Sequence, residues 1–139
     1  MEKEQYVTFE TAKLLRKNGF AWKCRSYYLK NGGRFEHCYQ EVLPRGEAVY
    51  ECPTQEEAIR WLREEYHFAV VPMPYRYPNT WQVIFVYLGR SMEGDDKYDI
   101  CQLRKIHLSY EAAAEYGIQY IVKSVVSRIL KELAKVKEN

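Results

Sequence analysis

The sequence lacks the short motifs that identify the common catalytic and ligand-binding sites. No Gly-rich loop is followed by Lys and Ser or Thr, and Asn31-Gly32-Gly33 is instead typical of a tight turn. No serine or cysteine nucleophile motif and no paired carboxylate accompanies His67 or His107. We therefore expect no catalytic residues and no cofactor, and a protein that is not an enzyme.

The cysteines also lack a recognisable pattern. Cys24, Cys38, Cys52 and Cys101 are scattered, with no C-x-x-C pair. Zinc ligands usually stand two to four residues apart, and since only the adjacent His37 and Cys38 come close to this spacing, we expect no metal site. Residues 1–5 are polar and lead into no apolar segment of the kind found in secretory signals. We expect reduced thiols in a cytoplasmic protein.

Long apolar runs and a strong charge of one sign are missing as well. No apolar run approaches the ~18 residues of a membrane span, so we expect no membrane contact. The 21 Lys and Arg nearly balance 19 Asp and Glu, and the net charge of +2 gives no whole-protein electrostatic argument for nucleic acid.

Tyrosine, in contrast, is abundant: 13 residues supply flat apolar area with a polar tip. The length of 139 residues predicts a single domain, residues 1–139.

Residues 81–88 predict a central β-strand. The segment is dense in β-branched and aromatic side chains and contains no Gly, Pro or charge. Its alternating faces carry Trp81, Val83, Phe85 and Tyr87 on one side and Gln82, Ile84, Val86 and Leu88 on the other. Because both faces are mostly apolar, we expect the strand to be covered on both.

Two edge strands are predicted beside this segment. Residues 68–77 contain Pro72 and Pro74, which remove hydrogen-bond donors from one edge only and block further pairing there. Residues 98–108 alternate poorly, as suits the opposite edge. The three strands predict an antiparallel meander.

Helices and a hairpin account for the rest. Thr8 and Gly19 bound a short helix, Thr54 begins a second with a capping box, and Ser109 caps a long third helix. The apolar stripe of this third helix continues past the length of the sheet. Residues 24–29 and 34–39 predict a hairpin, with a third short strand at 48–52. The fold class is α+β: an antiparallel three-stranded meander with helices packed on it, plus an N-terminal helix and β-hairpin.

Three different stretches are spread over most of the chain: TAKLLRKNGF at 11–20, PTQ at 53–55 followed by WLRE at 61–64, and YEAAA at 110–114. Together they resemble a family of small uncharacterised proteins encoded by phages and prophage-like elements of gut anaerobic bacteria. The resemblance implies a phage-associated cytoplasmic role with no known activity, and it supplies no active-site residue.

The apolar features favour a non-catalytic protein-interaction module. Three features require buried contact: the central strand with two apolar faces, the apolar stripe of the last helix that extends beyond the sheet, and the excess of tyrosine. The partner would be an unknown protein or a second copy of the chain in a homodimer. One compact monomer would also satisfy all three.

Nucleic-acid binding is the alternative function. The helix–three strands–helix order of residues 54–136 is also that of double-stranded RNA-binding domains. A surface for stacking and phosphate contact would comprise Tyr75, Arg76, Tyr77, Arg90, Lys97, Arg104 and Lys105. The near-neutral charge of the whole chain speaks against this alternative.

Overall fold

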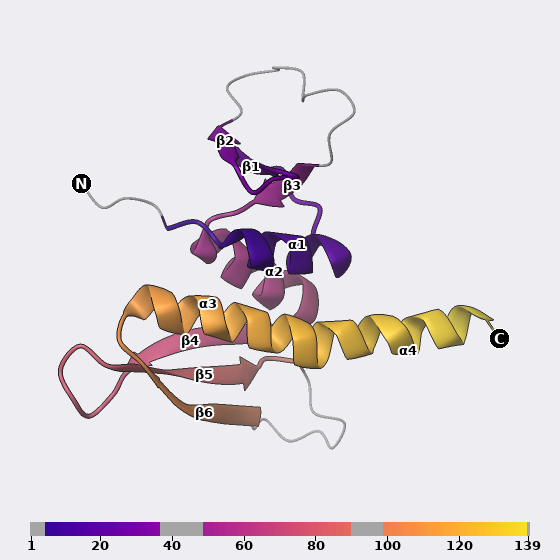
Figure 1. Cartoon of the computed structure of the whole chain (residues 1–139). Coiled ribbons are helices and arrows are strands. Elements are labelled where there is room, and N and C mark those ends of the chain that lie inside the picture. The colour runs from indigo at the N-terminus through magenta and orange to yellow at the C-terminus, as the bar shows by residue number, and fades with distance from the viewer. Residues whose placement is uncertain (1–4, 37–48, 90–98, 139) are drawn as a thin grey trace. The chain divides into compact units, whose positions relative to one another are not determined.

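The computed structural model describes residues 5–36, 49–89 and 99–138 (Figure 1). The chain divides into two compact units, which are described separately. The sheet unit is Gln55–Ile121, and the terminal unit combines Met1–Thr54 with Val122–Asn139. The single domain expected from the length of the chain stays a prediction.

The sheet unit contains the predicted meander. Its elements are α2 (Gln55–Tyr66), β4 (Phe68–Pro74), β5 (Trp81–Tyr87), β6 (Asp99–His107) and α3 (Tyr110–Ile121). The strand order is β4-β5-β6, and both pairings are antiparallel. Phe85 in β5 pairs with Val70 on one side and with Cys101 on the other. The central position of β5 and the edge position of the proline-containing β4 are thereby confirmed.

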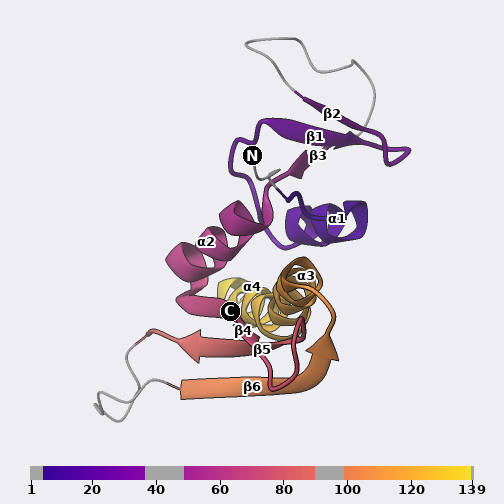
Figure 2. The same ribbon diagram turned by 90° about the vertical axis from the view of Figure 1, so that its left-hand side faces the viewer.

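One face of this sheet is covered by α2 and α3 (Figure 2). α3 comes close because Gly117 has no side chain: a Cβ atom there would lie 2.8 Å from Val70 Cγ1 and 2.9 Å from Val83 Cγ1. The Phe85 ring stacks on that of Tyr120 with centroids 5.5 Å apart. This inner face is the core of the sheet unit, and Val83 and Phe85 are almost completely buried.

The terminal unit contains a second antiparallel sheet. Its elements are α1 (Phe9–Lys17), β1 (Ser26–Leu29), β2 (Arg34–Glu36), β3 (Val49–Cys52), the π-helical segment η1 (Val122–Val126) and α4 (Ser127–Glu138). The order β2-β1-β3 confirms the predicted hairpin and places the third short strand against β1. Residues 37–39, predicted to end the hairpin, lie outside the described residues.

The ends of α1 follow the local chemistry of the sequence. The Thr8 hydroxyl accepts a hydrogen bond from the Thr11 amide at 3.3 Å, as expected of an N-cap. Gly19 has a φ of +95°, and the Phe20 amide donates to the Leu15 carbonyl at 3.0 Å. This is the Schellman arrangement that a C-terminal glycine permits.

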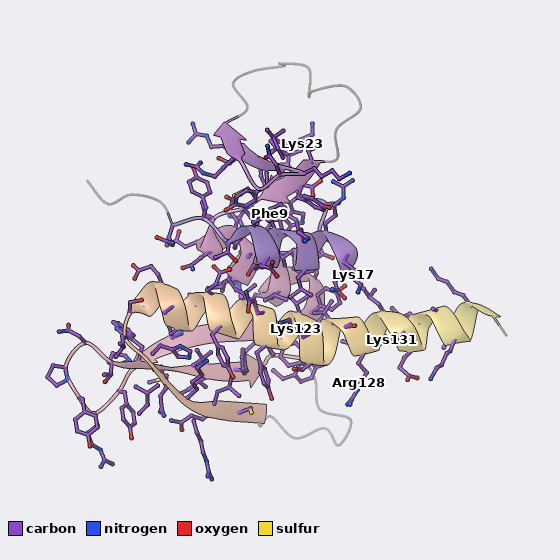
Figure 3. The ribbon with its side chains drawn as sticks, in the orientation of Figure 1. Phe9, Lys17, Lys23, Lys123, Arg128 and Lys131 are labelled. Atoms are coloured by element: carbon purple, nitrogen blue, oxygen red, sulfur yellow. The ribbon has the colours of Figure 1, made fainter. Side chains whose placement is uncertain are left out.

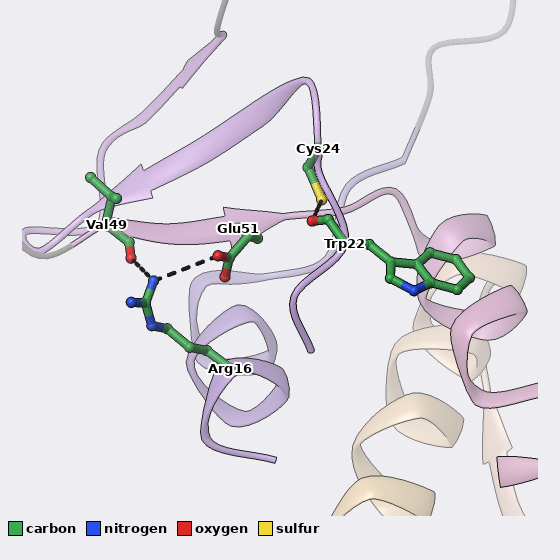
Figure 4. A network of polar contacts seen from close by, with 5 residues as sticks. All are labelled: Arg16, Trp22, Cys24, Val49 and Glu51. Carbon is green, nitrogen blue, oxygen red and sulfur yellow. Dashed lines mark hydrogen bonds and ion pairs between the residues drawn. The ribbon is translucent and has the colours of Figure 1, made fainter. Parts of the chain in front are cut away.

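α1 is also tied to β3 by polar contacts (Figure 4). Arg16 Nη1 donates to the Val49 carbonyl and lies 3.7 Å from Glu51 Oε1. Nearby, Cys24 Sγ donates to the Trp22 carbonyl at 3.4 Å. The two contacts of Arg16 hold the first helix against β3, an edge strand of the small sheet.

The long third helix has an irregularity that the sequence did not predict. Ser109 Oγ accepts from the Ala112 amide at 3.0 Å, which confirms the predicted cap, but the helix becomes π-helical at η1. η1 packs beside α1 and buries Val122 and Val126 completely. Part of the overhanging stripe is therefore buried against the N-terminal helix, whereas Val136 in α4 is 69% exposed.

Candidate functional site

The face of the β4-β5-β6 sheet opposite the helices carries exposed apolar side chains on both of its edge strands. Because strand side chains alternate, this face is formed by the residues between those that contact α3. We call it the outer sheet face, and its members are Ala69, Val71, Met73, Gln82, Ile84, Val86, Ile100, Gln102, Arg104 and Ile106. In the part of the unit that the structure describes, both helices lie on the other side of the sheet (Figure 2).

The apolar side chains of the outer sheet face are accessible to solvent. Val71 and Met73 on β4 are 39% and 41% exposed, and Ile100 and Ile106 on β6 are 68% and 43% exposed. They flank Ile84 of the central strand, which is partly exposed. Soluble monomers rarely expose contiguous apolar patches larger than a few hundred Å², and such patches mark sites of interaction.

The two glutamine side chains within this face already have partners. Gln102 Nε2 donates to Gln82 Oε1 at 2.6 Å, and Gln82 Nε2 donates to the Arg104 carbonyl at 3.0 Å. Gln82 is only 7% exposed, and these two hydrogen bonds satisfy its buried amide. Covering the face with another apolar surface would therefore leave neither of these hydrogen bonds broken.

The predicted Tyr/Arg surface begins in the turn between β4 and β5. The Tyr75 and Tyr77 rings meet edge to face with centroids 5.8 Å apart, and Tyr77 is 57% exposed. The Tyr75 amide donates to the Thr80 carbonyl at 2.8 Å, which closes the turn. Arg76, between the two tyrosines, is exposed.

The other predicted binding residues do not form a single surface with this turn. Arg104 belongs to the outer sheet face, whereas its neighbour Lys105 points to the inner side, with Nζ 4.6 Å from the centroid of the Tyr116 ring of α3. Successive side chains of a strand point to opposite faces, so Arg104 and Lys105 lie on different sides of the sheet. Arg90 and Lys97 lie outside the described residues.

Lys105 and Tyr116 border a buried histidine. The His107 ring lies 4.8 Å from that of Tyr116, and its Nε2 atom is buried without a hydrogen-bond partner among the described residues. Burial lowers the pKa of His107 from its ordinary value, and the positive charge of Lys105 lowers it further. Near pH 7 the imidazole is therefore neutral, and it packs against Tyr116 on the inner face of the sheet.

The cysteines and histidines do not gather in the described structure. Within residues 5–36, 49–89 and 99–138, no group of three or more His, Cys, Asp or Glu side chains could hold a metal ion. Cys24 and Cys52 are buried and Cys101 is exposed. His37 and Cys38, the one pair with a spacing close to that of zinc ligands, lie outside the described residues. None of the described helices combines the length and apolarity needed to cross a bilayer.

The two units differ in charge, which the net value for the chain conceals. The terminal unit has 14 Lys and Arg and 9 Asp and Glu, a net charge of +5. The sheet unit has 7 and 10, a net charge of −3. The net charge of the whole sequence hides this asymmetry. The sheet unit lies between the two parts of the terminal unit along the chain, so the sequence alone does not show which charges belong together. The predicted Tyr/Arg surface lies on the acidic unit.

Comparison of the chain with protein-family models, with curated proteins and with solved structures gives no match.

Proposed function

We propose that this protein is a non-catalytic interaction module whose outer sheet face binds a second copy of the chain. One observation supports the proposal: four large apolar side chains of this face, on both edge strands, are between 39% and 68% exposed. The accessory role in a phage-like element, implied by the resemblance of the sequence, belongs to the same proposal.

A second copy is the occupant that the chemistry of the face favours. Arg104, on the edge strand β6, is the only charged member of this face, so the apolar side chains of two copies can meet while Arg104 stays in solvent. The Gln82 and Gln102 amides need no new partner. Sheets commonly pack face to face about 10 Å apart, and two-fold dimers are the most frequent assemblies of soluble proteins.

The expected affinity is modest. Covering Val71, Met73, Ile100 and Ile106 recovers on the order of 1 kcal/mol for each side chain, or about 8 kcal/mol over two copies. The loss of rotational and translational freedom costs roughly 4–15 kcal/mol. With the lower of these costs the balance is about −4 kcal/mol, which corresponds to a dissociation constant of about 1 mM.

Size-exclusion chromatography with light scattering tests the proposal through a matched pair of variants. Ile100→Asp and Val136→Asp each replace an exposed aliphatic side chain, 68% and 69% exposed, with the same charge, but Val136 lies on α4 in the terminal unit. The wild-type mass should rise above the 16.6 kDa monomer with concentration. Ile100→Asp should remain monomeric, and Val136→Asp should behave as the wild type.

Two results would contradict the proposal. One is a wild-type monomer at all loading concentrations up to about 500 µM, where a dimer of the expected affinity is populated. The other is dimerisation that Val136→Asp abolishes and Ile100→Asp leaves intact, which would assign the contact to α4.

Nucleic-acid binding by the Tyr75–Lys105 region is the weaker function. Arg76 and Arg104 supply exposed cations there, but the unit that contains them has a net charge of −3, which repels phosphate.

A further inference from the structure

α4 in the terminal unit has a basic stripe. At about 100° per residue, Arg128, Lys131 and Lys135 fall within an arc of roughly 60° around the helix axis. Ile129, Leu133 and Val136 fall on the opposite side. All three basic side chains are exposed, and Figure 3 shows Arg128 and Lys131 extending from the helix.

Acidic neighbours compensate little of this charge. Among the residues that the structure describes, Arg128 and Lys131 form no ion pair. Lys135 pairs with Glu132 at 3.5 Å, but both side chains are about two-thirds exposed, and such surface pairs contribute little. Exposed helix faces usually mix charges of both signs, so a stripe of one sign indicates an anionic partner.

Further cations of the same unit lie near this stripe. Lys123 is an exposed residue of η1, the segment directly before α4. Lys17 is exposed in the last turn of α1, which packs beside η1 (Figure 3). Their positions extend the positive potential from α4 toward α1, in the unit whose net charge is +5.

We propose that the basic stripe of α4, extended by Lys123, binds the phosphate backbone of nucleic acid without reading its sequence. Arg128 and Lys135 stand about 10 Å apart along the axis, and a helix of about 10–12 Å diameter fits the major groove of duplex DNA. The stripe contains only cations and offers no ring for stacking, so its contacts are to phosphates, which duplexes and single strands share. This function is separate from self-association and uses the other unit of the chain.

The salt dependence of binding follows from the number of cations. Three or four phosphate contacts on a duplex predict a slope of log K against log salt of about −3 to −4. Removing two of these contacts should reduce the slope by about 1.8 and weaken binding roughly 100-fold at 50 mM salt. Both changes are measurable with the full-length chain.

Fluorescence anisotropy tests this with labelled duplex and single-stranded DNA of about 20 nucleotides, in about 25–200 mM KCl. The double variant Arg128→Gln/Lys131→Gln should show the reduced slope and the weakened binding. Arg63→Gln/Arg76→Gln removes the same charge from exposed positions of the sheet unit that are not on the outer sheet face, and it should bind as the wild type. Arg128→Lys should retain binding because it keeps the charge.

Three results would overturn the proposal. The first is no binding of either DNA at the lowest salt, and the second is an equal loss of affinity in the two double variants. The third is a loss of affinity only in the sheet-unit variant, which would support the Tyr75–Lys105 surface instead. Binding to vesicles containing phosphatidylglycerol, with no binding to DNA, would assign the stripe to a lipid surface. Matching far-UV circular dichroism spectra of all variants would confirm that they are folded.

Discussion

Replacing Gly117 by alanine tests how closely α3 approaches the sheet. In an exposed helix this change would stabilise the protein by up to about 1 kcal/mol, because alanine has the higher helix propensity. Here the new Cβ would lie 2.8 Å from Val70 Cγ1 and 2.9 Å from Val83 Cγ1, which is closer than carbon atoms pack. Such overpacking costs about 1–3 kcal/mol, so after the gain in helix propensity we expect a net destabilisation of up to about 2 kcal/mol.

Urea denaturation, followed by circular dichroism and tryptophan fluorescence, measures this change. A double-mutant cycle with Val83→Ala provides the control, since the smaller side chain makes room for the new methyl group. The two substitutions should couple favourably by about 0.5–2 kcal/mol, so that the second costs less in the presence of the first. If Gly117→Ala stabilises the protein, or the two changes are additive, α3 does not lie against β4 and β5 as described.

Three further predictions concern local interactions. Gly19→Ala should lower the free energy of unfolding by about 1 kcal/mol in urea titrations, because φ is +95° and the added Cβ meets no atom within 4 Å that could offset the strain. Tyr28→Phe should cost about 1–2 kcal/mol in the same assay, since the Tyr28 hydroxyl donates to the Val7 carbonyl at 2.6 Å; an unchanged midpoint would show that this bond is not formed. The folded-state pKa of His107 is lowered, so the folded protein binds its proton less readily than the unfolded chain, and stability should fall as pH drops below about 6.5. His107→Gln should flatten that part of the pH profile relative to the wild type, and an equally steep profile would assign the dependence to other groups.

The parts of the fold that depend on neighbouring residues were predictable from the sequence. The uninterrupted apolar segment at 81–88 identified the central strand, and the two prolines of β4 identified an edge. Thr8, Gly19 and Ser109 marked helix ends because capping is decided within one turn of helix. The prediction of one surface containing both Arg104 and Lys105 overlooked the same kind of local rule, since adjacent residues of a strand point to opposite faces.

Features that depend on distant segments were not predictable in this way. The apolar character of both faces of β5 indicated cover on two sides, but only the packing of α2 and α3 shows which of the two faces these helices cover. The π-helical η1 had no sequence signal, since the apolar stripe of the last helix is continuous with regular α-helical spacing. The division of charge between the units became visible only when residues 122–139 were found to belong with the N-terminal segment.

The most direct test of the outer sheet face is a dilution series observed by isoleucine methyl NMR. Ile84, Ile100 and Ile106 are on this face, whereas Ile118 and Ile121 are buried on α3 beneath the sheet. Self-association through the face predicts methyl shifts that change with concentration at the first three residues and stay constant at the other two. Shifts independent of concentration at Ile84, Ile100 and Ile106, or changes confined to Ile129 of α4, would contradict the account.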